Sequence, residues 1–212
     1  MPKRDKVSIA VIRRLPRYYR FLGLLLDGGS SRISSKELSI RMGFTASQIR
    51  QDLNCFGGFG QQGYGYNVEQ LRDQIGLILG LDKKFSCILI GAGNIGRAIA
   101  NNMDFNNLGF NLTAIFDINP AIIGEKISNV LVLPMEQLKS YCEQNKPKAA
   151  VLTIPTLAAP EIVDLLIEQG VYGFWNYTHY DITFKHKNVV VENVHLGDSL
   201  MTLSYRINNE EI

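Results

Sequence analysis

The chain has 212 residues, a length that fits one ordinary domain and one small one, because domains cluster near about 100 to 150 residues. Hydrophobic residues make up 46% and charged residues 20%, which argues against a disordered, collagen-like or coiled-coil chain. The apolar runs fall far short of the roughly 20 residues that cross a bilayer, which argues against an integral membrane protein.

The start of the chain and its cysteines indicate a cytoplasmic protein. Arg13 and Arg14 interrupt the first apolar stretch before it could form the core of a secretory signal. Cys55, Cys87 and Cys142 are far apart, odd in number and without metal-ligand spacing. We therefore expect a cytoplasmic location, no disulfide framework and no metal site.

Charge divides the chain into two parts, which we take as domains 1–84 and 85–212. The first holds 14 Lys and Arg against 7 Asp and Glu, a net charge of +7; the second holds 8 against 13, a net charge of −5. A basic domain joined to an acidic one predicts that the first binds a polyanion. A chance run of solvated charges is the alternative.

The basic part carries the pattern of a winged helix-turn-helix. Pro16 is expected in the first turn of a helix that stops near Asp27. Ser34 opens a short second helix with a capping box, and Gly43 ends it. Thr45 opens a third helix in the same way. Two short helices joined by a Gly-containing turn are typical of a helix-turn-helix.

The third helix has one apolar and one polar face. Ile49, Leu53 and Phe56 share a stripe at the helical spacing of about 100° per residue. The other positions can hydrogen-bond base edges in a major groove, where Gln suits adenine and Arg suits guanine. An ordinary amphipathic surface helix is the alternative. The candidate DNA-binding residues on this helix are Ser47, Gln48, Arg50, Gln51 and Asn54.

Residues 56–66 contain five glycines and four aromatic residues. This composition favours a two-stranded hairpin, the wing that commonly follows a recognition helix. Its turn is expected near Gln61 and Gln62, whose amides could lie in a minor groove. Residues 68–81 return to helical periodicity, and 82–84 form a plausible linker.

The acidic part begins with a dinucleotide-binding motif. A buried strand, residues 87–90, runs into Gly91-Ala92-Gly93-Asn94-Ile95-Gly96 and then into a helix, and Asp117 lies 21 residues after Gly96 at the end of the next apolar run. The glycines permit a tight turn, close approach of pyrophosphate and close packing, and the acidic side chain binds the adenosine ribose. We therefore predict an NAD(H) site that also includes Ile118; a purely structural glycine turn is the alternative.

Later apolar runs predict further strands at 130–133, 149–154, 173–176 and 189–191, with helices near Pro134 and Pro160. Ligands bind beyond the carboxyl ends of such strands. Thr153, Pro155 and Asn176 are therefore placed near the nicotinamide end. The last stretch, 196–207, is predicted to be an amphipathic helix that packs in its own domain or on a partner subunit.

A dehydrogenase is a second hypothesis, because it would use the same cofactor. It needs a proton-transfer group and a substrate domain, and neither is evident beyond the pair His179 and Asp181. We expect no catalytic residue. A third hypothesis keeps the DNA module but gives the second domain another adenine nucleotide, such as coenzyme A.

The chain resembles the Rex family of redox-sensing transcriptional repressors over essentially its whole length. The resemblance implies a homodimer with winged-helix and Rossmann-like domains and a C-terminal helix exchanged between subunits. It also implies that the protein binds a palindromic double-stranded operator and that NADH causes the protein to leave this operator. The matching motifs are Arg14-Leu15-Pro16, Tyr18-Tyr19-Arg20, the segments 33–38 and 45–53, Phe56-Gly57, Phe59-Gly60, Gly63, the loop 91–96, and the segments 152–155 and 189–194.

The sequence departs from the family at several positions. Gln51 replaces a Lys of the family's recognition helix, and Gln61-Gln62 replaces Lys-Arg at the wing tip, so we expect weaker DNA binding or a different operator. Asn102 replaces a common Tyr. His195 replaces an Asp that, in the family, pairs with the helix-one Arg matching Arg20 as part of the switch.

Overall fold

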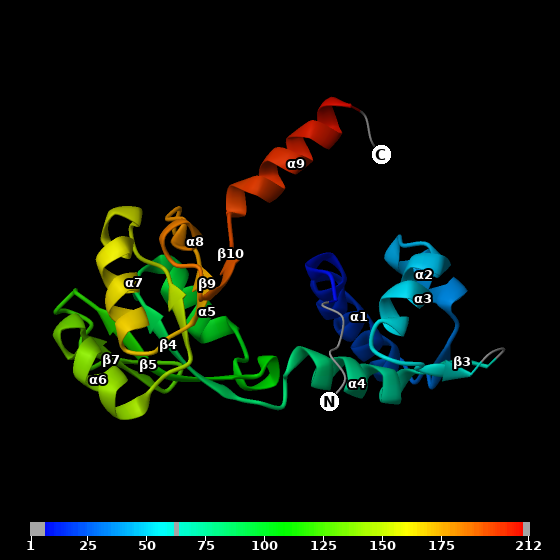
Figure 1. The fold of residues 1–212 in the computed structure, drawn as a ribbon, viewed down its shortest axis with the longest axis horizontal. Coiled ribbons are helices and arrows are strands. Elements are labelled where there is room, and N and C mark those ends of the chain that lie inside the picture. Colours follow the sequence, from blue (N-terminus) through cyan, green and yellow to red (C-terminus); the bar gives the residue numbers. More distant parts are fainter. Residues whose placement is uncertain (1–6, 62–63, 210–212) are drawn as a thin grey trace. The chain divides into compact units, whose positions relative to one another are not determined.

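The computed structural model describes residues 7–61 and 64–209. The chain divides into two compact units, Met1–Asp82 and Lys83–Ile212, and each is described by itself (Figure 1). In the order of the chain, the first unit contains α1 (Ile9–Asp27), β1 (Arg32–Ile33), α2 (Ser35–Met42), α3 (Ala46–Asn54), β2 (Gly60–Gln61), β3 (Gly65–Asn67) and α4 (Val68–Leu79).

Local capping fixes the helices of the first unit. The predicted capping box is present: the Ser34 hydroxyl accepts from the Glu37 N–H at 3.1 Å, and the Glu37 carboxylate accepts from the Ser34 N–H at 2.8 Å. The expected place of Pro16 was wrong. Helix α1 begins seven residues earlier, behind Ser8 as its N-cap, so Pro16 lies inside it.

The core of the first unit gathers apolar side chains from all four helices. Leu15, Leu22, Ile49 and Ile75 are fully buried there. The wing hairpin pairs β2 with β3 antiparallel, and β1, which the sequence did not predict, pairs with the other edge of β3. The helix-turn-helix α2–α3 is therefore held between α1, α4 and a small three-stranded sheet.

The second unit is built on a seven-stranded sheet with the order β10-β9-β8-β4-β5-β7-β6. All neighbours are parallel except β6 and β7, which form an antiparallel pair. Apart from β6, this is the strand order of a dinucleotide-binding Rossmann sheet. The strands are β4 (Phe85–Ile90), β5 (Phe110–Asp117), β6 (Lys126–Ile127), β7 (Val130–Pro134), β8 (Ala149–Leu152), β9 (Gly173–Asn176) and β10 (Val190–Asn193).

Helices cover the two faces of this sheet unequally (Figure 1). Helix α5 (Asn94–Asn102) packs on one face through Ile99 and Ala100. The other face holds α6 (Leu138–Asn145), α7 (Ala159–Glu168) and the short α8 (Ile182–Lys185). The fold predicted from the sequence is confirmed, while β6 and α8 were not predicted.

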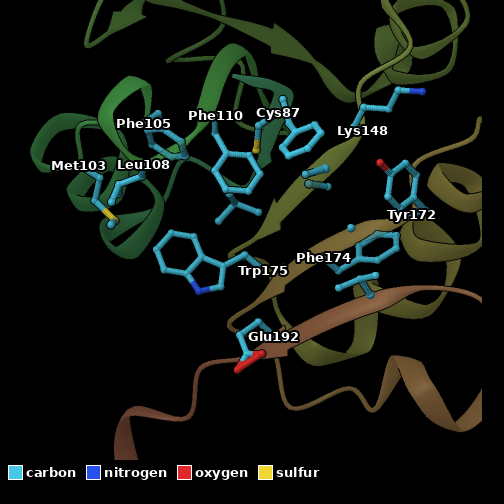
Figure 2. Close-up of a pocket in the computed structure, with 16 residues that line it drawn as sticks. Cys87, Met103, Phe105, Leu108, Phe110, Lys148, Tyr172, Phe174, Trp175 and Glu192 are labelled. Carbon is cyan, nitrogen blue, oxygen red and sulfur yellow. The ribbon is translucent and has the colours of Figure 1, made fainter. Parts of the chain in front are cut away.

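The side of the sheet that carries α5 is open over β8, β9 and β10. A cavity of about 430 Å³ lies there, lined mostly by apolar side chains such as Phe110, Met103 and Trp175, with Lys148 and Glu192 at its margins (Figure 2). It lies over the first residues of the strands, and the loop 91–96 does not line it.

The last helix, α9 (Leu196–Asn208), has no buried residue. It extends from the end of β10, as the red segment of Figure 1 shows. Its large apolar side chains are exposed: Leu196, Leu200, Met201, Leu203, Tyr205 and Ile207. Of the two predicted placements, packing in its own domain is therefore not observed.

Candidate nucleotide site and nucleic-acid interface

The turn after β4 depends on two glycines. Gly91 has φ +95°, a conformation that favours glycine, and its N–H donates to Phe116 O at 2.8 Å. A Cβ at Gly96 would lie 2.0 Å from Gly91 O and 2.9 Å from Thr153 Oγ1. Helix α5 can therefore begin this close to the strand only because residue 96 has no side chain.

Gly93 has a different role in the same loop. It is the N-cap of α5, with φ −70°, and a Cβ built there meets no atom within 4 Å. The space beside the first turn of α5 is thus open. Free backbone N–H groups at a helix N-terminus bind phosphate well, so the loop fits a pyrophosphate.

Asp117 lies next to this loop, as its spacing predicted. One carboxylate oxygen accepts from the Ala92 N–H at 2.5 Å, and the other accepts from the Asn119 N–H at 2.8 Å. These two bonds hold the carboxylate at the carboxyl end of β5. Ile118, the next residue, is 83% exposed, an apolar side chain beside the position predicted for the adenosine.

The loop after β8 is tied to the glycine loop. Thr153 Oγ1 donates to Gly91 O at 2.7 Å, and Thr153 N donates to Ile90 O at 2.9 Å. Pro155 lies two residues after Thr153 and directly precedes a 3₁₀ turn, Thr156–Ala158. Thr153 and Pro155 therefore lie at the switch point between β4 and β8, where dinucleotides bind in such sheets.

Asn176 lies where it was predicted, but its side chain is not free. It is fully buried; its Nδ2 donates to Tyr180 O and Asn193 Oδ1, and its Oδ1 accepts from the N–H and hydroxyl of Thr178. All of its hydrogen-bonding capacity is used. Asn176 therefore orders the loop after β9, and its contact with the nicotinamide stays a prediction.

The histidine pairing considered for a dehydrogenase does not form. Asp181 caps α8 through Phe184 N and accepts from Thr183 Oγ1 at 2.6 Å. His179 instead stacks on His195, with ring centroids 5.3 Å apart and planes at 4°. This contact could not be predicted from the sequence, because it joins segments that follow two different strands, β9 and β10.

The polar face predicted for α3 is largely present. Ser47, Arg50, Gln51 and Asn54 are exposed, and Arg50 Nη1 donates to Ser35 Oγ of α2 at 3.1 Å. Gln48 is the exception: it is half-buried, and its amide donates to Asp52 Oδ1 at 2.8 Å. The Gln48 amide is therefore partly engaged within the protein, and its contact with DNA stays a prediction.

Asp52 forms a buried cluster that sequence reasoning missed. Its carboxylate, 1% exposed, accepts two hydrogen bonds from Arg14 at 2.6 and 2.7 Å and one from the Tyr18 hydroxyl at 2.8 Å. Burial alone would raise the pKa of Asp52, but the hydrogen bonds from Arg14, Tyr18 and Gln48 outweigh it and lower that pKa. The cluster fixes the recognition helix to α1.

Burial and the bond to Asp52 also raise the pKa of Tyr18, so its hydroxyl stays protonated as a donor. One signal for the cluster was available. Asp52 lies between Ile49 and Leu53 on the apolar side of α3, and Arg14 and Tyr18 are four residues apart on α1. Spacing of three or four residues places side chains on one helix face.

The remaining predicted residues are placed only in part. Gln61 lies at the end of β2, and Gln62 lies outside the described residues. Arg20 is exposed on α1 in the first unit, whereas Asn102 and His195 belong to the second. The Asn102 amide donates to Ala98 O at 2.8 Å within α5, and His195 is the N-cap of α9.

Comparison with known proteins decides the family. Residues 6–54 match the model "Putative DNA-binding protein N-terminus", and residues 82–180 match "CoA binding domain". A redox-sensing transcriptional repressor Rex of Thermoanaerobacter pseudethanolicus (strain ATCC 33223 / 39E) is 54% identical over all of this chain and 94% of its own length. The chain belongs to the Rex family of redox-sensing transcriptional repressors.

Other Rex proteins agree over the full length. The Rex of Clostridium novyi (strain NT) is 52% identical over 98% of this chain and 99% of its own. A crystal structure of RSP in complex with β-NAD⁺ and operator DNA has a TM-score of 0.89 at 54% identity and covers 98% of this chain and 95% of its own. A crystal structure of RSP in complex with β-NADH has a TM-score of 0.89 at 51% identity and covers 98% of this chain and 97% of its own.

These Rex relatives confirm the family predicted from the motifs. They are named as repressors and not as enzymes, so the dehydrogenase hypothesis is not favoured. Among residues 7–61 and 64–209, no helix has the length and apolar character needed to span a membrane. The same residues contain no group of three or more His, Cys, Asp or Glu that could hold a metal ion.

Proposed function

We propose that this chain represses transcription by binding double-stranded operator DNA as a homodimer, and that NADH weakens this binding relative to NAD⁺. One observation carries the proposal: a helix-turn-helix with an exposed polar face and an open dinucleotide loop occur in the same chain. The RSP structures with NAD⁺ and operator DNA, and with NADH, support it.

We assign the nucleotide site to the carboxyl ends of β4, β5 and β8. The first turn of α5 would hold the pyrophosphate, Asp117 would accept from the adenosine ribose, and Ile118 would contact the adenine. A carboxylate repels a 2′-phosphate, so the site favours NAD(H) over its phosphorylated form. The assigned residues are Gly91, Ala92, Gly93, Asn94, Ile95, Gly96, Asp117, Ile118, Thr153 and Pro155.

Within this site the protein performs no redox step. The bound cofactor supplies a nicotinamide ring that is a cation in NAD⁺ and neutral in NADH. The chain's own residues bind and orient it, and differential affinity of two protein conformations for the two forms would shift the population that fits DNA.

Measurement of DNA binding in the presence of each form of the cofactor tests the proposal. A duplex would first be selected from a random library with NAD⁺ present, and its Kd measured by fluorescence anisotropy with NAD⁺ or with NADH. We expect NADH to raise the Kd at least about tenfold, within the usual range of coupling energies. Equal Kd values would contradict redox sensing, and failure to enrich any duplex would contradict the repressor assignment.

We assign contact with DNA bases or phosphates to Ser47, Gln48, Arg50, Gln51 and Asn54, with Gln61 and Gln62 in the wing. Gln51→Lys adds a cation on the exposed face of α3. If the new ammonium group contacts a phosphate, the slope of the logarithm of the DNA association constant against the logarithm of the salt concentration should steepen by about 0.9. Anisotropy from about 50 to 200 mM salt measures this. Gln70→Lys, the same change at an exposed position of α4, should leave the slope unchanged; equal slopes for both variants would contradict the assignment.

We propose that a second copy of the chain covers the apolar stripe of α9, by which we mean the exposed side chains of Leu196, Leu200, Leu203 and Ile207. Light scattering should then give a mass near twice 23.8 kDa. Leu200→Glu lies within the stripe and should produce monomers, whereas Thr202→Glu, on the opposite side of α9 by helical spacing, should not. A monomeric natural protein would contradict the dimer. We also propose a cytoplasmic location and no bound metal.

Coenzyme A remains the alternative ligand, because the second unit matches a CoA-binding family model over residues 82–180. Calorimetry that compares NADH, NAD⁺ and coenzyme A separates the two. We expect the pyridine nucleotides to bind more tightly, because the family members named here sense redox state. Tighter binding of coenzyme A would contradict the NAD(H) assignment.

A further inference from the structure

Arg17 of α1 lies beside the turn that leads into the recognition helix α3. Its Nη2 donates at 2.7 Å to Met42 O, at the end of α2, and its Cζ lies 4.8 Å from the centroid of the Phe44 ring. Phe44 directly precedes Thr45, the N-cap of α3. These two contacts, one on each side of Gly43, hold the guanidinium at the start of the recognition helix.

Two arginines of α1, three residues apart, have different partners. Arg14 donates two hydrogen bonds to the buried carboxylate of Asp52, so its charge is neutralised inside the protein. Arg17 is exposed, and its hydrogen bond goes to a carbonyl, which carries no net charge. Within residues 7–61 and 64–209, no carboxylate forms an ion pair with Arg17. The positive charge of Arg17 is therefore available to a ligand.

The surroundings of this guanidinium favour a phosphate group as the ligand. Arg13 and Arg20 are also exposed and lie on the same side of α1 by helical spacing, so the local field attracts an anion. A guanidinium has several N–H donors that suit phosphate oxygens, and the bond to Met42 uses one of them. Because the fork is already held in place, it loses less conformational freedom when it binds.

We propose that Arg17 binds a phosphate of the DNA backbone beside the start of α3 and so fixes the position of this helix on the duplex. This inference rests on the proposed DNA binding. Phosphate contacts set the register and orientation of a protein on DNA but carry no sequence information. Since the same guanidinium also holds Met42 and Phe44, it joins the DNA backbone directly to the turn that orients α3.

Fluorescence anisotropy at several salt concentrations tests the proposal, with the selected duplex and a duplex of scrambled sequence. Arg17→Gln should flatten the slope of the logarithm of the association constant against the logarithm of the salt concentration by about 0.9. It should raise the Kd about three- to tenfold at about 100 mM salt. The increase should be equal for the two duplexes, because both present phosphates. Arg17→Lys, which keeps the charge, should keep the natural slope.

Lys139→Gln serves as the matched control. It removes one positive charge from an exposed position of α6 and should leave the slope and the Kd unchanged.

A purely structural role of Arg17 predicts a different result. If Arg17 only held the end of α2, Arg17→Gln would lower stability to urea and weaken DNA binding with the natural slope. That result, or an equal change of slope in Lys139→Gln, would overturn the proposal. If the natural protein enriched no duplex, the repressor assignment itself would fail. Enrichment of a duplex together with an unchanged slope in Arg17→Gln would contradict the phosphate contact alone.

Discussion

Gly96→Ala is expected to destabilise the second unit by about 3 kcal/mol or more, because overpacking at a close backbone contact cannot relax cheaply. The new Cβ would lie 2.0 Å from Gly91 O, which itself accepts from Thr153 Oγ1. Helix α5 would have to move away from β4. Thermal unfolding should show a fall in Tm on the order of 10 °C, and NADH binding should be lost with the turn.

Gly93→Ala is the matched control three residues away. Its Cβ meets no atom within 4 Å, and its φ of −70° suits any residue, so stability should change by less than about 0.5 kcal/mol. The methyl group would nevertheless occupy the space assigned to pyrophosphate. We expect NADH affinity to fall at least about tenfold, which corresponds to about 1.4 kcal/mol. If Gly93→Ala bound NADH as tightly as the natural protein does, the assignment of this loop to the pyrophosphate would be contradicted.

Features that are formed by residues close together in the chain could be predicted from the sequence. The motif 91–96, its flanking strand and helix, and the distance to Asp117 are local in the chain, and the structure places all of them together. The capping box at Ser34 is local too. Such features follow from backbone geometry and short-range hydrogen bonds, so spacing alone identifies them.

The features that were missed depend on contacts between distant residues. Asp52 meets Arg14 across 38 positions, and the partner of His179 is set by the order of β9 and β10 in the sheet. No local pattern specifies these pairs. Pro16 was misplaced because the helix begins behind Ser8, whose hydroxyl accepts from Val11 N, and Ile12 and Leu15 pack into the core ahead of the proline. Strands β1 and β6 have two residues each, too few for a periodic pattern.

Removal of the Asp52 carboxylate should have the largest effect on the first unit. In Asp52→Ala, the Arg14 guanidinium, the Tyr18 hydroxyl and the Gln48 amide all lose their shared acceptor. Breaking a buried charged pair costs about 3 to 5 kcal/mol. Urea unfolding should show this loss, and operator binding should fall because α3 is no longer held against α1. Asp73→Ala, at an exposed position of α4, should change stability by less than about 0.5 kcal/mol.

The same cluster predicts how stability depends on pH. Because the pKa of Asp52 is lower in the folded protein than its ordinary value of 3.8, the unfolded chain binds this proton more readily. The contribution of Asp52 is therefore fully present above its ordinary pKa and is lost as the pH falls through the folded value. The natural protein should lose stability more steeply below about pH 4 than Asp52→Ala does. Parallel pH profiles of urea unfolding for the two proteins would mean that the carboxylate is not held as a buried anion by Arg14 and Tyr18.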